Sequence, residues 1–149
     1  MKATRLRGIG SDRGAVLIEF ALTLPLFLLL VVGMFDFGFA FHQYLVMTNA
    51  AREGARMRVL PGYGNQDAVD RVSAYLTAGG ISGTPTTTVT TNTVTSCAGC
   101  PAFDAVNVNV QMNYTFSMLG PFAAIFGSTF GTVSLSATSV MRMEVAAGG

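Results

Sequence analysis

A long apolar run near the N-terminus constrains this chain more than any other feature. Between Ala15 and Phe35 the sequence reads AVLIEFALTLPLFLLLVVGMF, and Glu19 is the only charged residue in it. Because a helix rises about 1.5 Å per residue, the run is as long as the hydrocarbon core of a bilayer is thick, about 30 Å. The sequence therefore predicts a single membrane-spanning helix over residues 15–35.

The charges before this run predict its orientation. Residues 1–14 form a short leader with one acidic residue, Asp12, and four basic ones, Lys2, Arg5, Arg7 and Arg13. Because Lys and Arg resist translocation, we expect the leader to stay in the cytoplasm and residues 36–149 to lie outside it. Acidic residues outnumber basic ones after residue 14, so no basic patch remains that would favour nucleic acid, and we exclude that class of partner.

A helical pattern continues beyond the apolar run. Apolar and small residues recur at helical spacing through residues 36–60, and Pro61-Gly62 ends the pattern. These residues are predicted to form an amphipathic stem, which needs a partner to bury its apolar stripe. Asp36, at the start of the stem, is expected to be an interfacial charge.

Residues 61–149 are predicted to supply that partner as a small extracytoplasmic domain. Apolar residues at helical spacing predict a short helix that ends at Gly79-Gly80. Alternation predicts a long half-buried strand over residues 106–116 and another strand over residues 133–145. The simplest assembly is an α+β fold in which the apolar face of an antiparallel sheet packs on the stem.

Two segments of this domain leave alternatives open. The Thr-rich stretch TPTTTVTTNTVTS, residues 84–96, favours β structure but has a weak pattern, so it is either an edge strand or a loop. The stretch LGPFAAIFG, residues 119–127, is expected to be a loop that covers the core, or otherwise an exposed apolar surface that binds a partner.

Glu19 needs an explanation, because a carboxylate near the bilayer centre costs about 2.5–3.5 kcal/mol and somewhat less near its edge. In one interpretation Glu19 lies at the interface and snorkels. In the other, a peptidase cuts after Gly14, so that the new amino group on Ala15 and the Glu19 carboxylate lie one helical turn apart. A basic leader, a Gly, four apolar residues, a Glu and the aromatic Phe20 are typical of class III signal peptides of pilins.

The segment RGAVLIEFALTLPLFLLLVVGMFDFGFAF and the later block TNAAREGAR resemble the TadE-like family of tight-adherence (Tad/Flp) pilus assembly proteins. The resemblance covers residues 13–60 best, extends more weakly over 104–145 and is absent over 80–102. It implies a pseudopilin or minor pilin of the bacterial inner membrane that supports adherence and biofilm formation. Implied partners are a prepilin peptidase, other Tad pilins, the pilus assembly platform in the inner membrane and the lipid bilayer.

The resemblance also implies roles for single residues. Gly14 would precede the cut, Ala15 would be the new N-terminus, and Glu19 would be the carboxylate of the mature helix. Phe20 stands where the major Flp pilin usually has Tyr, and this chain is far longer than a major pilin. Both differences favour an accessory role over that of the main filament subunit.

The block around Ala51 and Ala55 is a second candidate site. Small residues allow another element to approach closely, so Ala51, Arg52, Glu53, Ala55 and Arg56 are predicted to pack against the chain's own sheet or another pilin's stem. The alternative is a solvated stem on which Glu53 pairs with Arg56 in the next turn, worth only a few tenths of a kcal/mol.

Cys97 and Cys100 fall on the side of the membrane where disulfides form, so we expect a small structural disulfide, with free thiols as the alternative. A thiol oxidoreductase would need a βαβ context that is missing around them. Neither a catalytic set nor a metal or cofactor site is predicted, so we expect a protein that is not an enzyme. An anchored extracytoplasmic binding module is the alternative function.

Overall fold

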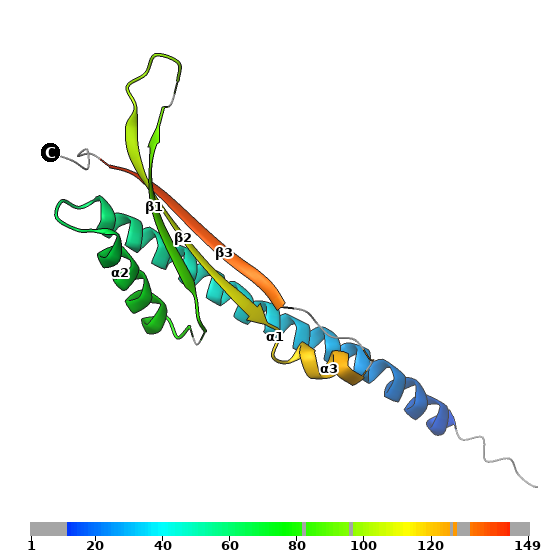
Figure 1. Cartoon of the computed structure of the whole chain (residues 1–149). Coiled ribbons are helices and arrows are strands. Elements are labelled where there is room, and N and C mark those ends of the chain that lie inside the picture. The colour runs from blue at the N-terminus through cyan, green and yellow to red at the C-terminus, as the bar shows by residue number, and fades with distance from the viewer. Residues whose placement is uncertain (1–11, 82, 96, 126, 128–131, 144–149) are drawn as a thin grey trace, which may run out of the picture.

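The computed structural model describes residues 12–81, 83–95, 97–125, 127 and 132–143 (Figure 1). Most of the predicted leader and the end of the last predicted strand, including Val145, lie outside these residues. The elements follow in the order α1 (Asp12–Val59), α2 (Asn65–Ala78), β1 (Thr86–Val94), β2 (Phe103–Thr115), α3 (Leu119–Ile125) and β3 (Thr132–Arg142).

Helix α1 is continuous over 48 residues, so it is about 70 Å long. It joins the predicted membrane span to the predicted stem without a break, and Pro25 lies inside it. Membrane helices tolerate an internal Pro because neighbouring groups compensate for the missing backbone donor. One helix therefore serves both as the apolar shaft and as part of the sheet domain.

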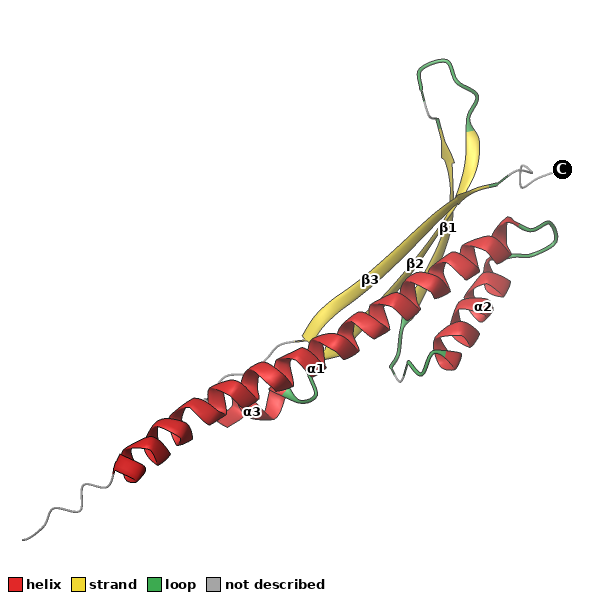
Figure 2. Ribbon diagram, turned by 180° about the vertical axis from the view of Figure 1, so that it is seen from behind, coloured by secondary structure: helices red, strands yellow, loops and turns green. Residues whose placement is uncertain are grey.

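Helix α2 follows α1 after a short turn and packs beside its outer end (Figure 2). Its first turn is held by Asp67, whose Oδ2 accepts a hydrogen bond from the backbone N–H of Gly64 at 2.7 Å. At its other end Gly80 adopts a positive φ of 73°, and the N–H of Ile81 donates to the carbonyl of Leu76. This glycine C-cap closes the helix near the predicted Gly79-Gly80 end.

The three strands form one antiparallel sheet in the order β1-β2-β3. Val108, in the central strand β2, lies opposite Val89 of β1 and Ser139 of β3. The alternation predicted for β2 places one set of side chains inside, and the buried members of that set are Val106, Val108, Val110, Met112 and Tyr114. On the other face Asn109 donates to Ser136 and Thr138.

The core lies between the inner face of the sheet, the outer half of α1 and α2. Its fully buried contributions from α1 are Met47, Ala50, Ala51 and Ala55, which cluster with Val72 and Leu76 of α2 and with the valines of β2. The predicted α+β fold, a long apolar helix packed on a small antiparallel sheet, is confirmed.

Two local assignments are decided by the structure. The Thr-rich segment forms β1, an edge strand, so the strand alternative holds over Thr86–Val94. The connection after β2 was expected to be a loop, but it contains the short helix α3, Leu119–Ile125. This helix lies beside α1 on the side of the sheet nearer the N-terminus (Figure 1).

Gly54 sets the approach of α2 to α1. A Cβ at this position would overlap Cγ2 of Val72 and would lie 3.2 Å from the carbonyl oxygen of Ala68. Val72 is β-branched and has little rotamer freedom in a helix, so it cannot swing aside. We expect Gly54→Ala to lower the free energy of unfolding by about 1–3 kcal/mol, measured by chemical denaturation in detergent.

Two variants control for this effect. Gly38→Ala also replaces a glycine inside α1, but its new Cβ would meet no atom within 4 Å, so it should not destabilise the fold. In the background of Val72→Ala, the Gly54→Ala change should cost much less than it does alone. Equal losses in both backgrounds would show that this contact does not limit the approach of the two helices.

Candidate functional site

The N-terminal half of α1, residues 14–35, is an apolar shaft in which no residue is buried by the described part of the chain. Its most apolar stretch of 18 residues is long enough to cross a membrane, and none of these residues is buried within the described structure. Exposed side chains of this shaft include Leu17, Phe20, Leu26 and Phe27. A core helix of a soluble domain would bury such residues, so α1 fits a single-pass membrane anchor.

The residues predicted for processing lie in the first turns of α1. Gly14 is half-buried, whereas Ala15, Glu19 and Phe20 are exposed. Ala15 and Glu19 are four residues apart on one helix, so they lie on the same face, one turn apart. The backbone carbonyl of Glu19 accepts a hydrogen bond from the hydroxyl of Thr23 at 2.9 Å.

The block around Ala51 lies at the core of the sheet domain. Ala51 and Ala55 are fully buried, while Arg52 and Arg56 point into solvent. Among the residues that the structure describes, Glu53 forms its salt bridge with Arg71 of α2 at 2.7 Å rather than with Arg56. The small residues therefore pack within this chain, and the ion pair links two helices instead of two turns of one.

Cys97 and Cys100 form a disulfide in the turn that joins β1 to β2. The N–H of Cys100 also donates to the carbonyl of Cys97 at 3.1 Å. The β1–β2 connection, which contains both cysteines, projects past the helices (Figure 1). No described helix begins at either cysteine, so the helix N-terminus that lowers a thiol pKa in redox proteins is missing from this part of the structure.

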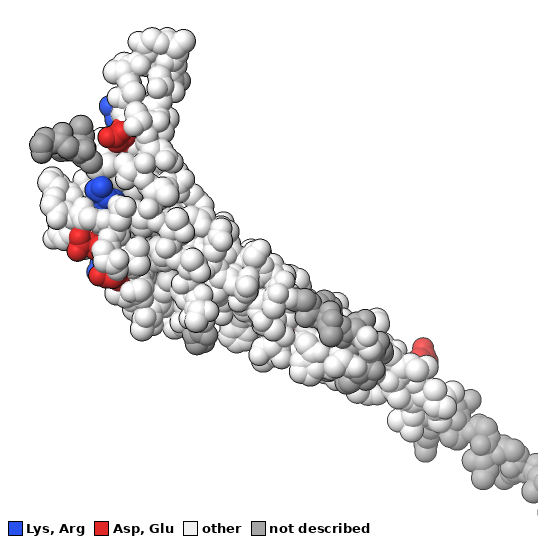
Figure 3. Space-filling view, in the orientation of Figure 1, with Lys and Arg blue, Asp and Glu red and all other residues white. Residues whose placement is uncertain are grey.

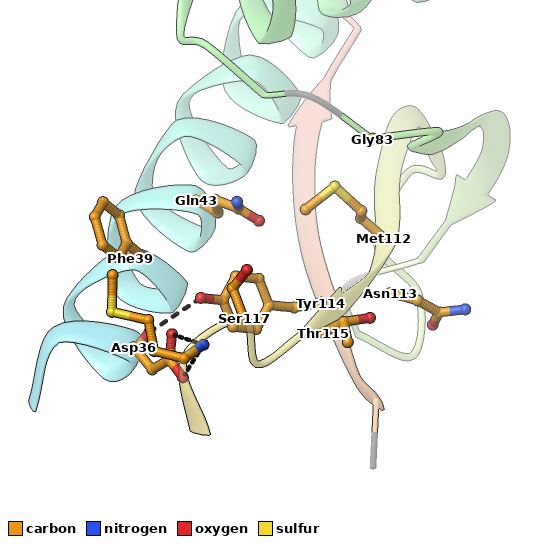
Figure 4. Close-up of a pocket in the computed structure, with 10 residues that line it drawn as sticks. Asp36, Phe39, Gln43, Gly83, Met112, Asn113, Tyr114, Thr115 and Ser117 are labelled. Carbon is orange, nitrogen blue, oxygen red and sulfur yellow. Dashed lines mark hydrogen bonds between the residues drawn. The ribbon is translucent and has the colours of Figure 1, made fainter. Parts of the chain in front are cut away.

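Asp36 occupies a position that the sequence did not reveal. It was expected to be an interfacial charge, but its side chain is fully buried beneath the end of β2 (Figure 4). Its Oδ2 accepts hydrogen bonds from the N–H groups of Leu119 at 2.7 Å and Met118 at 3.1 Å. An unpaired buried carboxylate would be very costly, and these donors at the start of α3 offset that cost.

Aromatic side chains lie beside the contact between Asp36 and the backbone of Met118 and Leu119, which we call the Asp36 junction. The hydroxyl of Tyr114 donates to the backbone carbonyl of Asp36 at 3.2 Å. Phe116 packs edge-to-face on both Tyr114 and Phe37, with ring centroids 5.3 Å and 5.7 Å away. Burial, with a smaller contribution from the Asp36 charge, raises the pKa of Tyr114 above its ordinary value of 10.0. The end of β2 is thus fastened to α1 by polar and aromatic contacts together.

A cavity of about 490 Å³ lies next to the junction, between α1 and the end of β2. Asp36, Gln43 and Tyr114 contribute to its wall (Figure 4). Oε1 of Gln43 is buried and accepts no hydrogen bond from the described residues. The described residues hold no group of three His, Cys, Asp or Glu side chains that could bind a metal.

Comparison with known families finds a match for part of α1. Residues 14–56 match the family described as TadE-like protein. The chain carries a TadE-like segment. This segment lies wholly within α1 and includes Gly14, Glu19, Asp36 and the Ala51 block. No curated protein and no solved structure matches the chain.

One residue of this segment has an environment that sequence reasoning missed. Asp36 lies inside the TadE-like segment, whereas its hydrogen-bond donors lie 82 and 83 residues further on. The available signal was a lone acid directly after an apolar span, together with the uncharged segment 119–127. Neither feature reveals the pairing by itself.

The Asp36 junction yields a prediction for stability. Asp36→Ala would leave the N–H groups of Met118 and Leu119 without their acceptor, so the free energy of unfolding should fall by about 1–3 kcal/mol. Asp36→Asn keeps one acceptor oxygen and should lose less. Asp70→Ala, on the exposed face of α2, serves as the control and should stay within about 0.5 kcal/mol of the parent. Equal stability of Asp36→Ala and Asp70→Ala in detergent would contradict the role given to the junction.

Tyr114 yields a prediction for the dependence on pH. Because folding raises its pKa, its contribution to stability is present below pH 10 and decreases as the unfolded chain ionises at higher pH. The free energy of unfolding should therefore fall more steeply above pH 10 in the parent than in Tyr114→Phe. Tyr63→Phe, at an exposed position, should keep the steep fall. Identical pH profiles for the parent and Tyr114→Phe would refute this assignment.

Proposed function

We propose that the chain is a pseudopilin or minor pilin of a Tad/Flp-type pilus system, with a structural role rather than an enzymatic one. The observation that carries this proposal is the TadE-like match over residues 14–56, which begins at the predicted cleavage residue. The uncovered apolar shaft of α1 supports it, because pilin-like proteins are anchored in the membrane before assembly. The basic leader favours a cytoplasmic N-terminus and a sheet domain outside the inner membrane.

In this proposal a prepilin peptidase cuts after Gly14. The new ammonium group on Ala15 and the Glu19 carboxylate would then face the same side of α1. Across two packed helices the same groups neutralise one another, which makes an exposed carboxylate on an apolar shaft acceptable. The partners are the peptidase, other Tad pilins and the assembly platform of the inner membrane, and the outcome is support for pilus formation and adherence.

Two other functions have less support. An anchored binding module accounts for the sheet domain but gives no role to the Gly14-to-Phe20 pattern. A thiol oxidoreductase would use Cys97 and Cys100, yet their disulfide lies in a hairpin turn after a Thr-rich edge strand, without the βαβ setting of such enzymes.

Mass spectrometry tests the processing step. Co-expression with a prepilin peptidase should yield a mature chain that starts at Ala15, while cells without the peptidase should keep the Met1 start. Replacement of Gly14 by a bulky residue, as in Gly14→Leu, should block the cut. The peptidase must accommodate the residue that precedes the cleaved peptide bond. A Met1 start in every sample would contradict the pilin pathway and leave an anchored domain.

Glu19→Gln separates cleavage from assembly. It keeps the shape of the side chain and removes its charge, so the chain should still be cut after Gly14. Its recovery in sheared pili, or its ability to support pilus formation, should fall because the Ala15 ammonium loses its partner. Phe20→Tyr, which retains an aromatic ring, serves as the matched control and should behave like the parent.

A further inference from the structure

Exposed charged side chains are absent from the end of the sheet domain that adjoins the apolar shaft. From Phe20 to Ala51, Asp36 is the only Lys, Arg, Asp or Glu residue of α1, and its side chain is buried. From Ala105 to Met141, across β2, α3 and β3, the chain has none. Figure 3 shows the charged side chains of the sheet domain gathered at its far end, around the ends of α1, α2 and the hairpin.

The length of this uncharged zone agrees with the thickness of a membrane. The 32 residues from Phe20 to Ala51 extend about 48 Å along a helix. A bilayer with its headgroup regions is about 40–45 Å thick, whereas its hydrocarbon core is about 30 Å. The zone therefore reaches beyond the predicted span 15–35 and includes the part of α1 against which α3 packs.

Helix α3 lies at the depth of the predicted span. Leu119 is buried and shares an apolar groove of about 580 Å³ with Leu29, Leu30 and Gly33 of α1. These α1 residues precede the end of the predicted span at Phe35. The hydrogen bonds from Met118 and Leu119 to Asp36 hold the start of α3 beside this part of α1. If α1 crosses the bilayer, α3 can avoid the lipid only by breaking these contacts.

The geometry points to a second membrane contact: α3, Leu119–Ile125, is inserted into the outer half of the bilayer. This inference rests on the membrane anchor in the proposed function. The α3 sequence LGPFAAI has no polar side chain. Lipid cannot hydrogen-bond backbone groups, and the helical form together with the Asp36 carboxylate satisfies groups that an open loop would leave unpaired. Lipid acyl chains are the occupant of the groove, because it continues directly into the uncovered shaft.

This contact gives Asp36 a further function. The carboxylate is placed just past the span, where its burial allows a short apolar helix to turn back towards the lipid. The C-terminal end of β2 and the N-terminal end of β3 are then held at the level of the headgroups. The sheet domain is therefore seated on the membrane surface and does not stand clear of it on an isolated stem.

The absence of Trp from the chain provides a clean test, because one introduced Trp reports on one site. Ala124→Trp probes α3 at an exposed position, and Met118→Trp, 46 % exposed, is a second probe if the first fails to fold. Phe27→Trp, 60 % exposed, marks the shaft, and Tyr63→Trp, 44 % exposed, marks the far end of the molecule. Each full-length variant is reconstituted in phosphatidylcholine vesicles whose acyl chains carry bromine either near the headgroup or near the chain end.

We expect the fluorescence of Ala124→Trp to be quenched by bromine near the headgroup more strongly than by bromine near the chain end. The fluorescence of Phe27→Trp should be quenched as well. The fluorescence of Tyr63→Trp should be as intense as it is in lipid without bromine. If Phe27→Trp is quenched and both α3 probes are not, the anchor stands and the inserted helix is refuted. A blue-shifted but unquenched α3 probe would show that protein, such as a second copy of the chain, covers α3. If Phe27→Trp is unquenched too, the membrane anchor itself fails.

Discussion

The sheet domain depends on burial of the C-terminal half of α1, because this helix contributes most of the helical side chains in its core. Met47, Ala50, Ala51 and Ala55 are fully buried against the valines of β2 and the apolar side of α2. A three-stranded sheet with one polar face has no second layer of its own, so removal of this helix would expose much of its apolar face. The anchor is therefore part of the domain, and the helix axis sets how the domain meets the membrane.

Two kinds of contact hold α1 to the sheet domain, one at the end far from the apolar shaft and one at the end near it. At the far end, Gly54 and the small residues beside it allow α2 to approach closely, and the Glu53–Arg71 pair lies over that contact. Such a half-exposed ion pair adds little, so close packing accounts for most of the stability there. At the near end, the contact is a buried carboxylate with backbone donors, and its energy is much more sensitive to the loss of a partner.

Length and hydrophobicity were enough to predict the first part of α1, and a 3.6-residue pattern was enough to predict its second part. Alternation predicted β2 and β3 because one face meets the core, although the buried Ser139 and the exposed Val140 break the pattern in β3. The Thr-rich β1 gave no such pattern, since only its first part lies over the core and Val94 is exposed. Helix α3 was missed because its pattern is too short and its start is fixed by Asp36, more than 80 residues away. The partner of Glu53 was missed for the same reason, because only the packed fold brings α2 within its reach.

In the proposed function, the same uncharged surface contacts lipid in the bilayer and other protein subunits in a pilus. Exposed side chains such as Phe39, Phe41 and Leu45 ring α1 just beyond the predicted span, and apolar area gains about 25 cal/mol per Å² when it leaves water. Extraction from lipid therefore requires protein surfaces that replace the lost lipid contacts on α1 and also on α3. A helix packed only against the shaft would leave α3 uncovered. The seated domain thus raises the barrier to leaving the membrane, and a partner that covers both surfaces at once would lower it selectively.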